Sequence, residues 1–165
     1  MNKIAVVTGG SGGIGRCTAA SLKAAGCTVY EISRRDIPSD GIIHMSADVT
    51  DEAQVRRVID EIAAREGRID ILVNNAGFGI SGAAELTESR DSHAQLELNV
   101  FGTDNVTRAV LPHMRAQGGG RIVCMSSIAG IVPIPFQLWY SVSKAAIIAY
   151  VLALQNEVRP FGISV

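Results

Sequence analysis

Short apolar runs alternate along the chain with segments whose apolar residues recur every three or four positions. The runs are rich in β-branched residues, which is typical of strands buried on both faces, whereas the second pattern indicates helices with one buried face. The pattern predicts strands at residues 4–7, 28–32, 41–45, 69–73 and 121–125. It predicts helices at residues 14–25, 51–65, 92–114 and 139–158. This alternation predicts an α/β domain with a parallel sheet and right-handed crossovers.

Three places near element ends carry further expectations. Thr50 is the expected N-cap of the second helix, because Asp51 and Glu52 follow it and favour the helix dipole. Pro112 lacks a backbone N–H and is expected to bend or end the third helix. Residues 161–165 are typical of a turn that enters a sixth strand, and the sequence stops there. A compact domain does not normally end inside a buried strand, so we expect a partial chain.

Length and composition narrow the class of protein. The 165 residues fit one domain, 1–165, and the 47% share of hydrophobic residues argues against disorder. The 15 basic and 16 acidic side chains give a net charge of −1, which lacks the positive charge of a general nucleic-acid binder or a polybasic membrane anchor. The longest apolar run, residues 145–154, is about half as long as a membrane span. We therefore expect neither a nucleic-acid partner nor a membrane span.

The cysteines indicate a reducing environment rather than a metal site. Cys17, Cys27 and Cys124 are odd in number, form no C-x-x-C pair and match no zinc-site spacing. We interpret them as small buried hydrophobic residues, which suits a cytoplasmic protein. The three histidines show no ligand spacing either, so no metal is expected.

A glycine-rich segment separates the first predicted strand from the first predicted helix. Glycines there permit a tight turn and a close approach of a pyrophosphate, while the helix N-terminus supplies amide donors and a favourable dipole. A glycine-rich turn alone would be weak evidence, but its place between a strand and a helix predicts a dinucleotide site. The candidate cofactor-binding residues of this segment are Thr8, Gly9, Ser11, Gly13, Ile14 and Gly15.

The end of the second predicted strand distinguishes the two nicotinamide cofactors. NAD sites place an acid here, about 20 residues past the glycines, to bind the ribose hydroxyls. This sequence has Ser33 followed by Arg34 and Arg35, and a guanidinium can pair with the 2′-phosphate of NADP. NADP(H) is therefore favoured, and NAD(H) is the alternative. A shift of one or two residues would make Glu31 the ribose ligand, and a solvated basic turn would explain the arginines without a cofactor.

Candidate catalytic side chains cluster in the second half of the chain. Tyr140 and Lys144 are spaced i, i+4 near the start of the last predicted helix, which places them on one helix face. A tyrosine whose phenolate is stabilised by an ammonium can donate a proton to a carbonyl oxygen or accept one from an alcohol. Ser127 follows the fifth strand at the edge where open α/β sheets bind ligands, with Ser126 as its rival. Asn99, inside the third helix, is either a site residue or an ordinary helix residue.

Taken together, these motifs resemble the short-chain dehydrogenase/reductase family from residue 3 to the end of the chain. The resemblance implies a Rossmann-like, doubly wound, three-layer α/β/α fold with strand order 3-2-1-4-5 and a sixth strand only begun. The family's motifs correspond to Thr8, Gly9, Gly13, Ile14 and Gly15 in the glycine loop, to Asp48 and Val49 beside the adenine, to Asn74, Asn75, Ala76 and Gly77 after the fourth strand, and to a catalytic tetrad of Asn99, Ser127, Tyr140 and Lys144.

The resemblance also implies what each residue does. Tyr140 would be the general acid/base, and Lys144 would stabilise its phenolate and bind the nicotinamide ribose. Ser127, which has the family's serine-to-tyrosine spacing, would polarise the substrate oxygen. Asn99 would hold a water that links Lys144 to solvent. The cofactor would be bordered by Asp48, Val49, Asn75, Ala76 and Gly77, with Arg34 marking NADP(H) preference.

The implied function is an NADP(H)-dependent oxidoreductase that acts on a carbonyl/alcohol pair as a homodimer or homotetramer. Family members continue well beyond this sequence, so the fifth strand is expected at an edge that the family buries. A non-catalytic dinucleotide-binding module, or an inactive fragment, is therefore the alternative. Apolar residues near the tetrad predict a hydrophobic ketone or secondary alcohol, although core packing explains them equally. They are Phe78, Ile80, Ile131, Val132, Ile134, Phe136 and Trp139.

Overall fold

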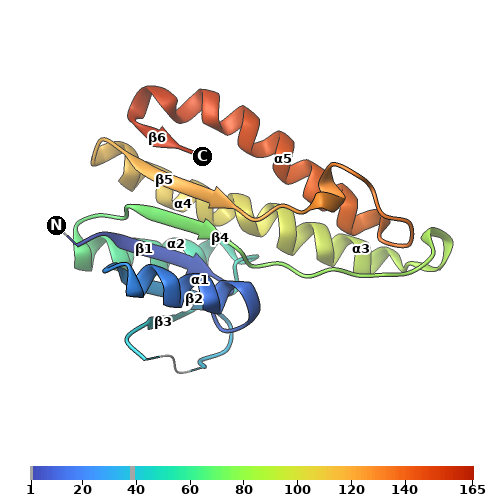
Figure 1. The fold of residues 1–165 in the computed structure, drawn as a ribbon, viewed down its shortest axis with the longest axis horizontal. Coiled ribbons are helices and arrows are strands. Elements are labelled where there is room, and N and C mark those ends of the chain that lie inside the picture. The colour runs from blue at the N-terminus through green and yellow to red at the C-terminus, as the bar shows by residue number, and fades with distance from the viewer. Residues whose placement is uncertain (1, 38–39) are drawn as a thin grey trace.

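The computed structural model describes residues 2–37 and 40–165, which form alternating strands and helices (Figure 1). The strands are β1 (Ile4–Thr8), β2 (Thr28–Ser33), β3 (Ile43–Ser46), β4 (Ile71–Asn74), β5 (Gly120–Cys124) and β6 (Ile163–Ser164). The α-helices are α1 (Gly13–Ala24), α2 (Glu52–Glu66), α3 (Ser89–Leu96), α4 (Gly102–Ala116) and α5 (Leu138–Val158). The short helical turns are η1 (Ala84–Leu86), η2 (Glu97–Phe101), η3 (Ile128–Gly130) and η4 (Arg159–Phe161).

The strands form one parallel sheet of order β3-β2-β1-β4-β5-β6. The chain moves outward from β1 to β3 and then crosses back to β4, so the direction of winding reverses between β1 and β4. Ligands of open α/β sheets bind at such a switch point, outside the carboxyl ends of the strands. The predicted doubly wound sheet and its strand order are confirmed, including a sixth strand of only two residues.

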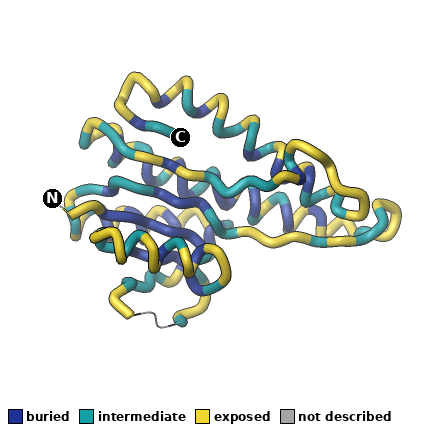
Figure 2. The backbone as a smooth tube through the Cα atoms, viewed as in Figure 1, coloured by how far each residue is buried: buried dark blue, intermediate teal, exposed yellow. Residues whose placement is uncertain are grey.

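The central strand β1 is buried along its whole length. Ile4 and Val6 pack in the larger core cluster with residues of α2 and α4, whereas Ala5 and Val7 pack with residues of α1 on the other face. Burial on both faces explains why the strand is a continuous apolar run without alternation. Figure 2 shows the buried backbone concentrated in the middle of the sheet, with exposed residues on the outer sides of the helices. The sheet is therefore the middle of three layers.

The helix predicted at residues 92–114 is longer and is interrupted. It begins at Ser89, passes through a π-helical turn at Glu97–Phe101 and ends at Ala116. Pro112 lies inside α4 and does not end it, so of the two predicted effects the termination of the helix is wrong. Pro112 and Arg108, whose carbonyl would have accepted the missing N–H, are both exposed, so water can reach that carbonyl.

The N-cap of α2 is Asp51 rather than the predicted Thr50. Asp51 Oδ1 accepts the N–H of Gln54 at 3.0 Å. Thr50 instead donates its N–H and its hydroxyl to Asp48 Oδ1, at 3.0 and 2.8 Å. Thr50 does not cap the helix because its side chain is already bonded to Asp48, and Asp51 takes this role instead.

The expectation that β5 is an edge strand holds for only part of its length. β6 covers its amino end, where Gly120 pairs with Ile163 and Arg121 pairs with Ser164. Further along the same strand, Val123 remains 40% exposed. The carboxyl half of β5 is therefore open on this side in the described part of the chain.

Helix α5 is long and apolar. The segment Leu138–Phe161 is long and apolar enough to cross a membrane, although the expectation of no membrane span rested on the shorter run at residues 145–154. The core helix of a folded domain passes the same test. Ile147, Leu154 and Val158 are buried, and the last two belong to the larger core cluster. The helix thus has a packed face in this fold.

Candidate active site

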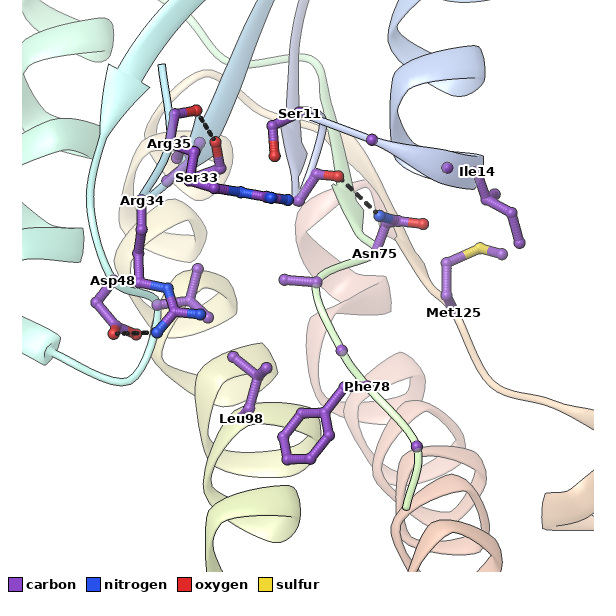
Figure 3. Close-up of a pocket in the computed structure, with 18 of the residues that line it drawn as sticks. Ser11, Ile14, Ser33, Arg34, Arg35, Asp48, Asn75, Phe78, Leu98 and Met125 are labelled. Carbon is purple, nitrogen blue, oxygen red and sulfur yellow. Dashed lines mark hydrogen bonds and ion pairs between the residues drawn. The ribbon is translucent and has the colours of Figure 1, made fainter. Parts of the chain in front are cut away.

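A cavity of about 600 Å³ opens at the carboxyl ends of β1, β2, β4 and β5 (Figure 3). Loops that are far apart in the sequence meet around it, together with the start of α5. The wall includes most of the predicted site residues: Gly9, Ser11, Gly13, Ile14, Ser33, Arg34, Asp48, Val49, Asn75, Ala76, Gly77, Tyr140 and Lys144.

The glycine loop between β1 and α1 is packed too tightly for a side chain at Gly15. Gly9 has a φ of 67° and donates its N–H to the carbonyl of Ile32 at 2.8 Å. A Cβ on Gly15 would lie 2.4 Å from the carbonyl oxygen of Gly9 and 2.4 Å from Asn75 Nδ2. Gly12 precedes α1 and no side chain caps the helix, so its first N–H groups are available to an anion.

Thr8 and Asn75 tie the glycine loop to the loop that follows β4. The Thr8 hydroxyl accepts the N–H groups of Asn75 and Ala76, both at 3.0 Å. Asn75 Nδ2 donates to the carbonyls of Thr8 and Gly9, at 3.0 and 3.4 Å. Thr8 is buried, so it shapes the cavity from behind and does not line it.

Ser33, the last residue of β2, lines one end of the cavity together with Arg34 and Arg35, which follow it. The Arg34 side chain is 74% exposed, and its Nη1 lies 3.7 Å from Asp48 Oδ2 (Figure 3). An exposed ion pair of this kind contributes little to stability, so the guanidinium can turn to another anion at low cost. Glu31 is not on the wall, because it is buried and its carboxylate contacts His44 on β3. The placement of Glu31 gives no support to its role as a ribose ligand.

Tyr140 and Lys144 lie one turn apart on α5, and both line the cavity. Lys144 Nζ is 5.7 Å from the centre of the Tyr140 ring and donates to the carbonyl of Met125 at 2.7 Å. Lys144 is 7% exposed, and this burial lowers the pKa of its ammonium. The end of β5 thus holds the ammonium close to the phenol.

Asn99 lies in the π-helical turn η2, behind the cavity wall. Its Oδ1 accepts the N–H of Phe78 at 3.0 Å, and its Nδ2 donates to the carbonyl of Phe78 at 2.9 Å and to the Ser143 hydroxyl at 3.0 Å. A Cβ on Gly77 would lie 3.0 Å from Asn99 Oδ1 and 3.8 Å from Lys144 Nζ. Asn99 therefore joins η2, α5 and the loop after β4 at a point next to Lys144.

The two serines that follow β5 have different partners. Ser126 lines the cavity and donates its hydroxyl to the carbonyl of Lys144 at 2.8 Å. The Ser127 hydroxyl accepts the N–H of Ala129 at 3.2 Å and caps η3, and Ser127 is not among the wall residues. The role of Ser127 at the substrate stays a prediction.

The wall also holds residues that the motifs did not single out. They include Ile32, Ala47, Gly79, Leu98 and Met125. Each lies within two residues in the sequence of a predicted site residue. This proximity was the one feature of the sequence from which they could have been predicted. Of the apolar residues expected around the tetrad, Phe78 lines the cavity, whereas the loop that follows η3 carries four that are exposed. These four are Ile131, Val132, Ile134 and Phe136.

Comparisons with known proteins agree with this geometry. A profile described as short chain dehydrogenase matches residues 3–165. The chain is 43% identical over 164 residues to 3-ketodihydrosphingosine reductase from Bacteroides thetaiotaomicron, covering 99% of this chain and 61% of that protein. A short-chain dehydrogenase from Streptomyces avermitilis is 40% identical with a TM-score of 0.94, and the match covers 99% of this chain and 63% of that one.

A gluconate 5-dehydrogenase from Burkholderia cenocepacia, in complex with NADP and tartrate, is 32% identical with a TM-score of 0.93. The match covers 99% of this chain and 69% of that structure. This chain therefore spans less than two thirds of the length of the Bacteroides and Streptomyces relatives. Because the family profile covers it from residue 3 to residue 165, the chain belongs to the short-chain dehydrogenase family.

Proposed function

We propose that this chain forms the cofactor-binding and catalytic part of an NADP(H)-dependent oxidoreductase that interconverts a ketone or aldehyde and an alcohol. The observation that carries the proposal is one cavity lined by the glycine loop, by Arg34, and by Tyr140 with Lys144. The loop and Arg34 suit a phosphorylated dinucleotide, and the last pair suits proton transfer beside it. Relatives named as a reductase and a dehydrogenase agree with it.

The residues present fit the cofactor. The tight packing at Gly15 and the uncapped start of α1 leave backbone N–H groups for a pyrophosphate. Arg34, exposed at one end of the cavity, would pair with a 2′-phosphate. When bound, the cofactor supplies or accepts the hydride. The other residues proposed to border it are Gly9, Ser11, Gly13, Ile14, Ser33, Asp48, Val49, Asn75, Ala76, Gly77, Tyr140 and Lys144. Thr8 would support them from behind the wall.

The tetrad would handle the proton and orient the substrate. The Tyr140 hydroxyl donates its proton to the carbonyl oxygen during reduction and accepts it from the alcohol during oxidation. The Lys144 ammonium, held by the carbonyl of Met125, stabilises the phenolate. Ser127 donates a hydrogen bond to the substrate oxygen. Asn99, beside Lys144, holds the water that returns protons from solvent.

The proposal is tested by titrating the protein with NADPH and with NADH calorimetrically, then following NADPH absorbance with a panel of ketones. Tighter binding of NADPH and reduction of a ketone would support it. Binding without reduction of any ketone would indicate a non-catalytic dinucleotide-binding module. Failure to bind either cofactor would contradict the assignment of the cavity.

Replacing Arg34 with alanine is expected to weaken NADPH binding about 10- to 100-fold, because a charge-assisted hydrogen bond to a phosphate is lost. NADH binding should change by less than about twofold, because NADH carries no 2′-phosphate. Calorimetric titration measures both. Arg56→Ala is the control, since Arg56 is exposed on α2 and pairs with Glu52 at 3.3 Å. Equal losses for the two cofactors in Arg34→Ala would contradict the role given to Arg34.

Replacing Ser127 with alanine is expected to lower kcat about 10²-fold, as for the loss of one donor to a reacting oxygen. Ser126→Ala should instead cost about 1 kcal/mol of stability, because it removes the bond to the Lys144 carbonyl. Steady-state kinetics and urea unfolding of both variants distinguish them. The reverse pattern would assign the catalytic hydroxyl to Ser126.

We further propose a hydrophobic ketone or secondary alcohol as the substrate. Phe78 is 39% exposed on the cavity wall, and the exposed loop with Ile131, Val132 and Phe136 carries further apolar surface. The relative named 3-ketodihydrosphingosine reductase agrees with a ketone. Apolar side chains exposed on α5, including Val142 and Leu152, favour a homodimer or homotetramer.

A further inference from the structure

A buried acid–imidazole pair lies next to the Arg34 end of the cavity. Glu31 on β2 and His44 on β3 are partners in the sheet, and His44 Nδ1 contacts Glu31 Oε1. The side chains are 3% and 18% exposed, respectively. No described residue bonds to Glu31 Oε2, although this atom is buried. A carboxylate is an acceptor only, so this one has more acceptor capacity than its neighbours fill.

Ser33 connects this pair to the cavity. Its side chain lies on the cavity wall, with Oγ 3.3 Å from Glu31 Oε1 and 3.0 Å from the carbonyl oxygen of Arg35. Figure 3 shows the contact with Arg35. A serine hydroxyl has one hydrogen, and both neighbours are acceptors. The hydrogen is therefore committed within the protein, and Ser33 meets a ligand in the cavity as an acceptor.

The polarity of this hydroxyl distinguishes two adenosine ligands. A ribose 2′-hydroxyl can donate to an acceptor oxygen, whereas a 2′-phosphate is itself an acceptor and needs donors. The Glu31 carboxylate also adds negative charge behind Ser33, which disfavours a phosphate there. Glu31 thus favours the hydroxyl, while Arg34 favours the phosphate.

We propose that Glu31, acting through Ser33, is a positioning residue that sets the ratio of NADP(H) to NAD(H) affinity, with His44 moderating its effect. The inference rests on the proposed function, because it concerns the same adenosine pocket. It assigns opposite effects to the two residues. Neutralising Glu31 weakens one of the two acceptors that compete for the Ser33 hydrogen and removes the negative charge behind Ser33, and both changes favour a phosphate. Removing His44 makes the carboxylate depend more strongly on that hydrogen.

The packing around Glu31 determines which substitution can test this. A Cβ on Gly10 would lie 2.7 Å from Glu31 Cβ, so the side chain supports the glycine loop directly. A truncation of Glu31 would disturb that loop for reasons unrelated to charge. Glu31→Gln keeps the shape and removes only the charge, and it is the variant to use.

The test compares adenosine 2′,5′-bisphosphate with adenosine 5′-monophosphate, which differ only in the 2′-phosphate. In Glu31→Gln, the dissociation constant measured by calorimetry is expected to fall about fivefold for the bisphosphate. For the monophosphate it should stay within about twofold of the wild-type value. His44→Leu should weaken bisphosphate binding about threefold with the monophosphate unchanged. The double variant should behave like Glu31→Gln alone, because His44 acts only through the carboxylate.

Glu66→Gln is the matched control. Glu66 is half-buried and accepts the hydroxyl of Tyr30 at 2.5 Å, and Tyr30 lies next to Glu31 in β2 but points to the opposite face. The Glu66→Gln substitution removes the same charge as Glu31→Gln but has no link to Ser33. The ratio of bisphosphate to monophosphate affinity should therefore stay as in the wild type. His44→Asn, whose amide can donate in place of Nδ1, should also keep that ratio. Thermal unfolding of each variant verifies that it is folded.

The wild-type ratio and its change in the variants test different statements. Equal wild-type affinities for the two ligands would contradict the proposed NADP(H) preference. The effect of Glu31→Gln is measured relative to the wild type, whichever ligand the wild type prefers. An unchanged ratio in Glu31→Gln, or shifts of the same sign in Glu31→Gln and His44→Leu, would overturn the inference.

Discussion

Replacing Tyr140 with phenylalanine is expected to lower kcat for carbonyl reduction about 10²- to 10⁴-fold, because the proton donor to the carbonyl oxygen is lost. The dissociation constant for NADPH should stay within about twofold, since the ring still packs beside Gly79 and a single neutral hydrogen bond is removed. Lys144 keeps its bond to the carbonyl of Met125, so the cavity should retain its shape. Steady-state kinetics and calorimetric titration measure the two quantities.

Tyr150→Phe on the same helix is the matched control. The Tyr150 hydroxyl donates to Asp104 Oδ1 at 3.0 Å, away from the cavity wall, and burial raises the pKa of this phenol. Its loss should cost about 1 kcal/mol of stability and leave kcat unchanged. A Tyr140→Phe protein that reduces ketones as fast as the wild type would remove Tyr140 from the mechanism.

Replacing Gly15 with alanine is expected to destabilise the protein by about 1–3 kcal/mol, as overpacking of a close-packed site does. NADPH binding should weaken at least about tenfold, because the glycine loop must move to make room and its N–H groups move with it. The added Cβ would overlap with the backbone of Gly9 and with the side-chain amide of Asn75, which is held by its hydrogen bonds to the carbonyls of Thr8 and Gly9. Urea unfolding and calorimetry test both effects.

Gly12→Ala is the comparison that isolates this overlap. Gly12 has an extended backbone with a φ of −164°, and a Cβ there would have no neighbour within 4 Å among the described residues. The free energy of unfolding of Gly12→Ala should be unchanged or raised by up to about 1 kcal/mol, because alanine lowers the conformational entropy of the unfolded chain. If Gly15→Ala were as stable as Gly12→Ala, the loop would be looser than its contacts indicate.

The alternation of strands and helices could be predicted because burial determines which positions of each element are apolar. The apolar run of β1 requires cover on both faces, and together with the alternation of strands and helices it indicates a parallel sheet. The spacing of apolar residues does not predict the order of the strands in the sheet. That order was predicted from the resemblance to a family. The glycine loop was predictable for a local reason, since its tight turn and its contact with Asn75 admit only glycine at Gly15.

Other features depended on contacts between distant segments. The π-helical turn at Asn99 is held by Phe78 and Ser143, which lie 21 and 44 residues away. Nothing near Asn99 in the sequence indicates it. The choice between Ser126 and Ser127 depends on where α5 passes, because Ser126 bonds to the backbone of Lys144. Pro112 is tolerated because it faces solvent, which its own neighbours in sequence do not specify.

The partly covered strand β5 makes the sheet extendable on one side. Beyond Arg121 its outward N–H and carbonyl groups have no partner strand in the described part of the chain, and such groups can pair with an added strand. An added strand would meet a β5 that is already held in place, since β4 pairs with β5 from the other side up to Asn74 and Cys124. The cavity wall at Met125 and Ser126 would therefore gain a neighbour without being rearranged.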